Sequence, residues 1–445
     1  MAGPVGPGGA NLCPRWKIGT QRASVAGENW RQPSPTAGSV MQHSTKRILT
    51  THAGSLPRPP DLLDMTLARQ EGRAVDEAAR QQRLPGAVKE IVNKQIELGI
   101  DVIDDGEYSK PSFVTYVAER LGGYEVDKNS APRVPWAGSR EALAFPEFYS
   151  FSNSGARPDR MICTAPVTYK GMPQLKRDID NLKSAINGAK VEAFMPAISP
   201  ANIEDWMPNA YYNKQEDYLF AVADAMREEY KAITNAGFLV QIDDPRLVSY
   251  YLVNPKASIA ECRKWAQVRV EALNHALRGI PPERIRHHTC YGINMGPRVH
   301  DMEVKHLIDI ILQINAGAYS FEAANPRHEH EWKIWGNAKL PKDKVLIPGV
   351  ISHSTVLVEH PELVAERIVK YASLVGKERV IAGSDCGFAT FAGSKEVHPS
   401  IVWAKMQAMT EGARMASKEL WRKVGKKKAG KKKAGKKEAA PRAKK

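Results

Sequence analysis

The 445-residue sequence contains no run of apolar residues long enough to cross a membrane. A membrane-spanning helix needs about 18 or more consecutive apolar residues, so we do not expect this chain to span a bilayer. Residues 1–40 also lack the apolar segment of a secretory signal, although their few, mostly basic charges would allow a transit peptide. Cysteine is scarce and irregularly spaced, which argues against a disulfide framework and for a reducing, cytoplasmic location. The five cysteines are Cys13, Cys163, Cys262, Cys290 and Cys386.

The sequence has little apolar or aromatic content at its basic C-terminal end. Residues 422–445 contribute +12 of the formal net charge of +15 and residues 1–45 contribute the other +3, so residues 46–421 carry no net charge. The repeated GKKKA sequence predicts a disordered Lys-rich tail over residues 422–445. Such a tail could contact nucleic-acid phosphates weakly and without sequence preference, or it could be a solvating appendage with no partner.

Residues 1–45 are predicted to be a disordered extension, and residues 46–421 one folded domain. Residues 1–40 are rich in Gly, Pro, Ser and Ala, and Met41 is an alternative effective start, which would make them dispensable. From Ile48 onward, short apolar runs alternate with amphipathic stretches. Eight β-then-α units over about 370 residues predict an α/β fold of the (β/α)8 TIM-barrel class, with insertions. The expected strands are Arg47–Thr51, Ile100–Asp104, Val191–Ile198, Phe238–Ile242, Ile285–Cys290, Ala318–Phe321, Val345–Val350 and Arg379–Gly383.

Helical patterns separate these strands, and two segments do not fit the eight-unit count. A further apolar run, Met161–Thr168, and the loop-rich residues 108–158 are expected to be insertions between the second and third units. The clearest helical patterns are Ala87–Leu98, Asp217–Ala236, Ile259–Arg278, Glu303–Asn315 and Pro361–Val375.

Titratable or metal-binding residues follow most of the expected strands. The C-terminal ends of barrel strands meet at one mouth, so these side chains are predicted to converge there and not to play purely structural roles. They are Ser55, Glu107, Asp243, His288 with Cys290, Glu322, His353 and Cys386.

The segment His288-Thr289-Cys290 carries the most specific chemistry. Residues i and i+2 of a strand share one side, so His288 and Cys290 could bind one ion together. With Glu322 and Cys386 they supply thiolates, an imidazole and a carboxylate, which are donors that Zn²⁺ favours. Two thiolates and a carboxylate make zinc a poor Lewis acid for water and suit it to holding a thiol as a thiolate. The alternative is a buried cysteine with satisfied core polar residues.

Seven motifs together resemble the catalytic C-terminal domain of the cobalamin-independent methionine synthase family. They occur in the family's order over residues 46–420, and the similarity is greatest to its short, single-barrel relatives. The motifs are THAGSLPRP, GIDVIDDGE, QIDDP, HTCYG, the Glu of YSFEAAN, the His-Ser of GVISHS, and GSDCG.

The resemblance implies a zinc site and a substrate pocket. The residues that match the family's Zn²⁺ ligands are His288, Cys290, Glu322 and Cys386. The residues that match its catalytic and substrate-binding positions are His353, the acid that protonates the departing nitrogen of the methyl donor; Glu107 and Asp243, which hold the homocysteine amino group; and Ser55, at its carboxylate. The family's pterin-covering aromatic is nearest to Trp206, about two residues out of register. The family's Thr-Ile-Gly-Ser is His52-Ala53-Gly54-Ser55 here, which could alter the pocket.

Several nearby residues admit two interpretations. His287 should face away from His288 and serve packing. The cluster His328, Glu329 and His330 looks like a second metal site but also suits a supporting role beside Glu322. Asp244 and Asp385 could orient ligands or cap helices. Arg58 could meet a substrate anion or lie along the surface.

The resemblance implies methyl transfer to the thiol of homocysteine, forming methionine, with small-molecule acceptor and donor as the partners. The donor would be 5-methyltetrahydrofolate or another small methylated compound. One alternative is alkyl transfer to another thiol, as in the similar epoxyalkane:coenzyme M transferases. That acceptor carries a sulfonate and no amine, so Glu107 and Asp243 favour an amino-acid thiol. Another alternative is a non-catalytic protein tethered to nucleic acid by its tail.

Overall fold

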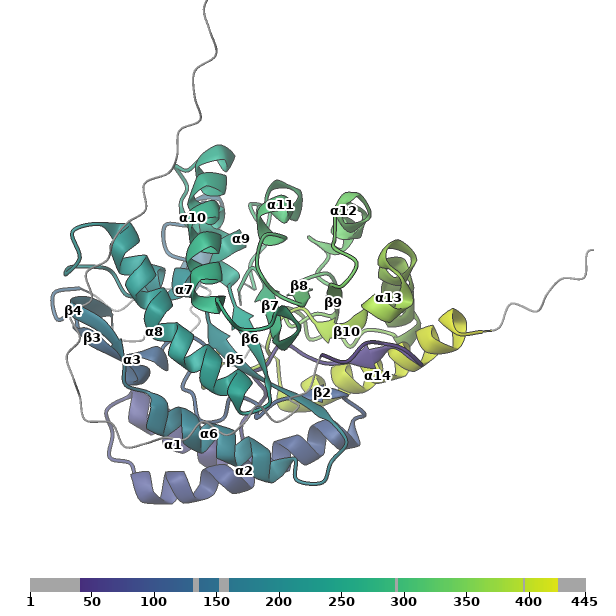
Figure 1. Ribbon diagram of the computed structural model, residues 1–445, viewed down its shortest axis with the longest axis horizontal. Coiled ribbons are helices and arrows are strands. Elements are labelled where there is room, and N and C mark those ends of the chain that lie inside the picture. The colour runs from purple at the N-terminus through teal and green to yellow at the C-terminus, as the bar shows by residue number, and fades with distance from the viewer. Residues whose placement is uncertain (1–40, 131–135, 152–159, 293–294, 395–396, 423–445) are drawn as a thin grey trace, which may run out of the picture. The chain divides into compact units, whose positions relative to one another are not determined.

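Eight parallel strands form the centre of the molecule (Figure 1). The structure is a computed structural model that describes residues 41–130, 136–151, 160–292, 295–394 and 397–422. The sheet runs in the order β1-β10-β9-β8-β7-β6-β5-β2. Its strands are β1 (Leu49–Thr50), β2 (Val102–Ile103), β5 (Glu192–Ile198), β6 (Leu239–Asp243), β7 (Ile285–Thr289), β8 (Ala318–Phe321), β9 (Val345–Ile351) and β10 (Ile381–Ser384).

The two ends of this sheet meet, so the sheet is a nearly closed barrel. The Asp101 amide donates to the Thr50 carbonyl over 3.0 Å, and Thr51 Oγ1 donates to the Val102 carbonyl over 2.8 Å. These bonds connect the start of β2 to the end of β1. The predicted (β/α)8 class is confirmed, and each expected strand overlaps an observed one.

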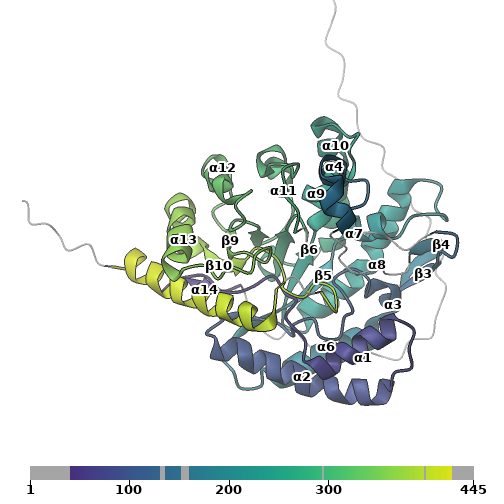
Figure 2. The ribbon, with the colours of Figure 1, turned by 180° about the vertical axis from the view of Figure 1, so that it is seen from behind.

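Helices cover the outside of the barrel in both views (Figures 1 and 2). The strands are buried on both faces, as expected where helices pack outside a parallel sheet and side chains fill its interior. The larger helices are α1 (Pro60–Gln70), α2 (Glu77–Glu97), α6 (Met172–Ala185), α7 (Pro200–Trp206), α8 (Gln215–Asn235), α9 (Pro245–Val253), α10 (Ile259–Leu277), α12 (Trp332–Asn337), α13 (Pro361–Val375) and α14 (Pro399–Leu420).

The predicted helix over Glu303–Asn315 is wrong in part. The chain instead forms a 3-10 turn at Val304–His306 and a single turn of helix, α11 (Ile308–Ile311). Four isoleucines lie between residues 308 and 314, and β-branched side chains lower helix propensity. The ends are also bonded elsewhere, because the Val304 amide donates to Glu331 and the Asn315 amide to Asn274.

The insertion after the second unit contains the extra strand expected from the sequence. Strand β4 (Met161–Tyr169) pairs with β3 (Leu121–Val126) in a two-stranded antiparallel sheet that is separate from the barrel. Its other elements are the short helices α3 (Val117–Arg120), α4 (Arg140–Ala144) and α5 (Pro146–Phe151).

The predicted boundary of the N-terminal extension at residue 45 is wrong. Met41 is 5% exposed and belongs to the apolar cluster inside the barrel, and the Ser44 hydroxyl donates to the Val380 carbonyl. Burial of the Met41 side chain in the barrel end fixes residues 41–45, although their mostly polar composition is typical of a disordered segment. The predicted extension before Met41 and the tail after Arg422 lie outside the described residues. Among the described helices, none is long and apolar enough for a membrane span.

Candidate active site

Every strand-end residue expected at the mouth is buried there. His288 lies in β7 and Asp243 ends β6, while the others follow the strands of their units. All eight are between 2% and 6% exposed. Because the strands are parallel, their C-terminal ends face the same way, and the side chains form two adjoining regions. We call them the thiol region (His288, Cys290, Cys386, with Glu322 and His353 beside them) and the carboxylate region (Glu107, Asp243, Lys110).

The thiol region contains a group of three potential metal ligands. Ligand atoms of His288, Cys290 and Cys386 all lie within 4.8 Å of one another, and the two Sγ atoms are 3.2 Å apart. His288 Nδ1 lies 3.0 Å from Ser320 Oγ, while its Nε2 is buried without a hydrogen-bond partner in the described part of the chain. A buried imidazole nitrogen beside two thiols is an arrangement that a thiophilic metal ion would satisfy.

Glu322, the fourth expected ligand, lies in a neighbouring group with His353 and Asp385. Its Oε1 accepts from the Tyr291 amide and its Oε2 from Arg298 Nη1, each over 2.8 Å. Burial opposes ionisation, but the nearby positive charge, led by Arg298, lowers the pKa of Glu322 to about 2. The structure therefore supplies an ionised carboxylate that is already held by other protein groups.

His353 follows β9 and lies beside Glu322. Its Nε2 is 3.4 Å from the Gly292 carbonyl oxygen, and its Nδ1 has no hydrogen-bond partner among the described residues. Burial lowers the pKa of His353 to about 4, and the Glu322 carboxylate only partly offsets this effect. Burial thus favours the neutral imidazole, whereas the Glu322 carboxylate favours the protonated form that a general acid needs.

Asp385 orients the loop that carries Glu322. Its Oδ1 accepts from the amides of Ala323 and Ala324 over 2.7 and 2.8 Å. This contact is close because Gly349 leaves room, and a Cβ there would collide with Asp385 Oδ1. Of the two interpretations offered by the sequence, the orienting role matches these contacts.

The carboxylate region contains its own cation. Lys110 Nζ lies 3.3 Å from Glu107 Oε2 and donates to the Pro196 carbonyl over 2.6 Å. Asp243 accepts from Gln241 Nε2 over 2.7 Å. Burial raises the pKa of Asp243 well above its usual value, and the Glu107 charge raises it further. Glu107 and Asp243 therefore interact electrostatically, and the Lys110 ammonium lies beside them.

Arg58 does not lie along the surface, because this side chain fixes the backbone of the carboxylate region. It is 7% exposed and donates to the carbonyls of Glu107, Lys110 and Ala389. Glu107 itself has φ of 58°, a left-handed conformation rare for residues other than glycine. The Arg58 hydrogen bonds thus hold the Glu107 backbone in a conformation that a glutamate rarely adopts.

Ser55 and Trp206 occupy opposite kinds of environment at the mouth. Ser55 Oγ packs so closely against Gly387 that a Cβ there would collide with it. Trp206 ends α7, is half-buried, and lies 6.1 Å from the Phe391 ring, centroid to centroid. Ser55 is thus in the polar interior, whereas Trp206 contributes to an aromatic rim.

Four contacts of the site were not anticipated from the sequence. Lys110 lies only three residues after Glu107, a spacing that could have suggested the pair. Ser320 lies on the neighbouring strand opposite His288, so strand register could have found it. Arg298 and Trp136 come from irregular segments with no periodic signal, and Trp136 packs over Gly292.

The histidines beside the ligands serve the scaffold. His287 is fully buried and packs edge-on against Tyr319, which confirms its predicted packing role. His328 stacks on Tyr291 at 3.9 Å and contacts Asp301 and Glu331.

The His328, Glu329 and His330 side chains do not converge on a metal site. Glu329 pairs with Arg367, and His330 is 61% exposed. His328 instead supports the aromatic residue whose amide bonds Glu322.

Asp244 and His52 face away from the ligand groups. Asp244 accepts from Asn202 and makes no capping hydrogen bond to α9, so the capping interpretation is wrong. His52 Nε2 lies 2.7 Å from Gln95 Oε1 on α2, and its ring packs near Phe194. His52, which replaces the threonine of the family's start motif, therefore contacts α2 and β5 and not the ligand groups.

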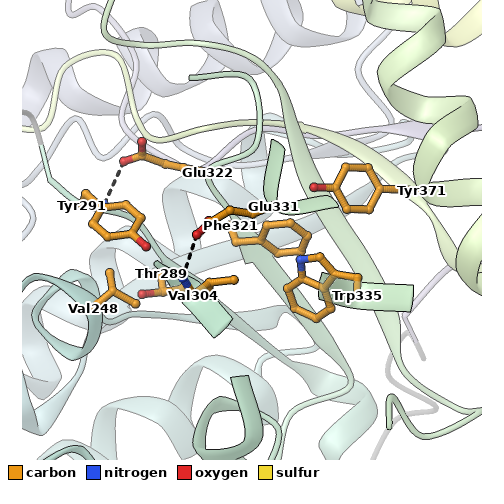
Figure 3. Close-up of a pocket in the computed structure, with 9 residues that line it drawn as sticks. All are labelled: Val248, Thr289, Tyr291, Val304, Phe321, Glu322, Glu331, Trp335 and Tyr371. Atoms are coloured by element: carbon orange, nitrogen blue, oxygen red, sulfur yellow. Dashed lines mark hydrogen bonds between the residues drawn. The ribbon is translucent and has the colours of Figure 1, made fainter. Parts of the chain in front are cut away.

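A void beside Glu322 is too small for a substrate (Figure 3). Its volume is about 10 Å³, close to the room that one water needs. Tyr291 lies on one side of it, and Trp335 and Tyr371 lie on the other. Its lining is largely apolar and aromatic, as in a small packing gap behind the β7 and β8 ends.

Comparison with known proteins points to one family. The model of the family described as "Cobalamin-independent synthase, Catalytic domain" matches residues 48–140 and 199–411. A methionine synthase of Saccharolobus islandicus (strain Y.N.15.51) is 28% identical over 377 residues, covering 84% of this chain and 96% of the relative. One from Thermococcus kodakarensis is 24% identical over 374 residues, covering 84% and 94%.

Two solved structures share the fold. A B12-independent methionine synthase from Shewanella sp. W3-18-1, in complex with selenomethionine, has a TM-score of 0.65 at 19% identity, covering 84% of this chain and 99% of that one. A putative vitamin-B12 independent methionine synthase from Listeria monocytogenes has a TM-score of 0.59 at 19% identity, covering 83% and 98%.

Proposed function

Because the chain belongs to the cobalamin-independent methionine synthase family, we propose that it transfers a methyl group to the thiol of homocysteine and forms methionine. The observation that carries this proposal is the group of His288, Cys290 and Cys386, whose ligand atoms lie within 4.8 Å of one another. The curated relatives are methionine synthases, and the Shewanella structure contains selenomethionine, an analogue of the proposed product.

We propose Zn²⁺ as the metal, held by His288, Cys290 and Cys386 with Glu322 as the fourth donor. The unpartnered His288 Nε2 and the adjacent thiols fit such an ion, and Arg298 keeps the Glu322 carboxylate ionised beside them. Bound zinc would hold the substrate thiol as a thiolate, whereas a free thiol with a pKa of about 8.5 is only about 3% ionised at pH 7.

The carboxylate region would hold the amino group of the acceptor. Glu107 and Asp243 provide two acids, and Lys110 compensates about one of their charges. Burial favours the protonated form of Asp243, so an incoming ammonium would favour its ionisation and supply the second positive charge of a balanced cluster. Ser55, buried beside Gly387, is proposed to contact the substrate carboxylate.

On the donor side, we propose that His353 supplies a proton. A methyl group leaves nitrogen poorly unless that nitrogen is protonated, and His353 lies beside the thiol region with one ring nitrogen unpartnered. The methyl carbon forms its bond to sulfur as the bond to nitrogen breaks, and the proton neutralises the departing nitrogen. Trp206 is proposed as a wall for the donor, which is 5-methyltetrahydrofolate or another small methylated compound.

The test is a donor and acceptor screen with purified, zinc-loaded protein. Homocysteine is the acceptor, methylated folates and smaller methyl compounds are the donors, and methionine formation is followed. We expect metal-dependent methionine formation with at least one nitrogen-methyl donor. If coenzyme M is alkylated and homocysteine is not, the chain acts on a different thiol.

A further inference from the structure

A second, larger cavity lies on the rim of the barrel. Its volume is about 470 Å³, within the usual range of small-molecule sites. Residues of three helices, α1, α2 and α6, line it together with residues between Ser109 and Arg120. These three helices lie side by side in both views (Figures 1 and 2).

The lining of this cavity is strongly charged and mostly cationic. It includes five basic side chains and three acidic ones. Arg69 pairs with both Glu77 and Glu119, and Arg120 pairs with Asp178. These pairs account for the acids of the wall.

The other two arginines, Arg80 and Arg177, are paired weakly or not at all among the described residues. Arg177 makes no ion pair with any residue that the structure describes. Arg80 is only 3% exposed, and its single acidic contact, to Glu77, is long at 3.5 Å. Its Nη2 donates to the Ser109 carbonyl, while its Nε has no partner in the described ranges. A buried guanidinium whose Nε donor is unused is costly, and a ligand that accepts from Nε would complete its hydrogen bonds.

Helix α6 adds a third positive feature. This 14-residue helix begins at the cavity, has Gly171 as its N-cap without a side-chain hydrogen bond, and carries no acidic residue in its first turn. Pro173 at the second position has no amide N–H, so this helix offers an anion the amides of Met172 and Gln174 and the positive end of its dipole. Gln174, in the same turn, has an amide oxygen without a partner among the described residues, which suits a ligand that also donates.

We propose that this cavity binds a phosphate group, either as inorganic phosphate or carried on a small metabolite. Arginine forks match phosphate oxygens in pairs, helix N-termini bind phosphate through their amides, and a protonated phosphate oxygen can donate to Gln174. Arg80 and Arg177 are the principal contacts, and the start of α6 is an additional one.

The cavity also connects to the carboxylate region through Lys110. This side chain lines the cavity, and its Nζ lies 3.3 Å from Glu107 Oε2. An anion that attracts Lys110 leaves Glu107 less neutralised, so Glu107 binds an ammonium more tightly. This coupling rests on the proposed function, because it requires Glu107 to hold the amine of the acceptor. By linkage, the acceptor then tightens phosphate binding by the same factor.

Calorimetric titration of the full-length protein with inorganic phosphate and with glycerol phosphate tests the site directly. Arg80→Gln and Arg177→Gln should each weaken binding about ten-fold or more, since each removes a charge-assisted contact. Arg414→Gln, in an exposed ion pair on α14, is the matched control and should change nothing. Arg177→Gln covers the case in which Arg80→Gln fails to fold, because Arg177 is exposed and makes no ion pair in the described chain.

Tighter binding of glycerol phosphate identifies a metabolite as the source, and equal binding identifies the free ion. Absence of phosphate binding in an active preparation, or equal binding by both variants and the control, would overturn the site while the proposed methyl transfer stands. A homocysteine titration with and without phosphate tests the coupling. An acceptor affinity that phosphate does not raise would overturn the link through Lys110.

Discussion

The two regions of the barrel mouth differ in how completely the protein satisfies its own polar groups. In the carboxylate region, Lys110 and Gln241 already bond Glu107 and Asp243. In the thiol region, His288 Nε2 and His353 Nδ1 are buried without partners in the described chain, and two thiols face each other. Buried polar atoms without partners need an added ligand to complete their hydrogen bonds, whereas carboxylates that protein groups already bond do not. The thiol region should therefore be sensitive to metal, and the carboxylate region should tune affinity.

Replacement of both thiols should have the largest effect on metal content and turnover. Cys290→Ser combined with Cys386→Ser should abolish stoichiometric metal content and lower turnover by at least about 10³-fold, because metal ions supply several kcal/mol to such reactions. Metal analysis and methionine formation provide the two readouts. The control replaces Cys163 and Cys262, which are buried in β4 and α10. A double variant that still holds one metal per chain would rule out the thiol region as its site.

Substitution of His353 separates proton transfer from binding within the thiol region. His353→Asn should lower kcat about 10²–10⁴-fold, while metal content and homocysteine affinity remain close to wild type. A methylsulfonium donor, whose leaving group needs no proton, should partly restore the rate. His360→Asn is the matched control, because His360 caps α13 and asparagine is a good N-cap. Equal losses with both donors would contradict the acid role.

Substitution of Glu107 should show the milder behaviour of the carboxylate region. Glu107→Gln should raise the KM for homocysteine about ten-fold or more through loss of a charge-assisted contact, with metal content unchanged. Steady-state kinetics with a range of homocysteine concentrations measure this effect. Glu366→Gln, exposed on α13, should leave the KM as it is. If coenzyme M outcompetes homocysteine by orders of magnitude, an amine-binding role is wrong.

Glu192, near the opposite end of the barrel, shows what burial alone does to a carboxyl group. Burial raises its pKa from 4.5 to about 7, although the Gln42 amide donates to it. Because the folded pKa is raised, the folded state favours the protonated form, and its stabilisation is lost as pH rises from about 4.5 to 7. Glu192→Gln should remove this loss, which is at most roughly 3 kcal/mol. Denaturant unfolding of both proteins at pH 5 and pH 8 measures the difference.

Removal of the chain ends should have the smallest effect on either region. Deletion of residues 1–40 and 426–445 should leave turnover and zinc content within about two-fold, since neither segment has the composition to pack into a core. Any retention on nucleic acid at low salt should disappear with the tail. A loss of activity after either deletion would mean that the removed end acts at the mouth.

The strands were predictable because each is a short apolar run bounded by polar residues. The convergence of the strand-end residues followed from parallel topology, which needs no knowledge of side-chain packing. The residue type alone could not reveal that Arg58 points inward and donates to the Glu107 carbonyl, because a long cationic side chain can equally lie along the surface.

Contacts made by irregular segments were also beyond sequence reasoning. Arg298 reaches Glu322 from a loop without periodicity, and Met41 fills the barrel although polar residues follow it. Both positions depend on the closed barrel, so they become visible only after all eight units are assembled.

The two thiols come from strands that are separated by β8 and β9 in the sheet and by 96 residues in the chain. During synthesis, His288 and Cys290 leave the ribosome well before Cys386 does. An ion met at that stage finds only half of the proposed donors and exchanges freely. For a metal held as we propose, full-strength loading therefore waits for the last strand, and translation products that stop before Cys386 lack one of the two thiolates and should hold zinc more weakly.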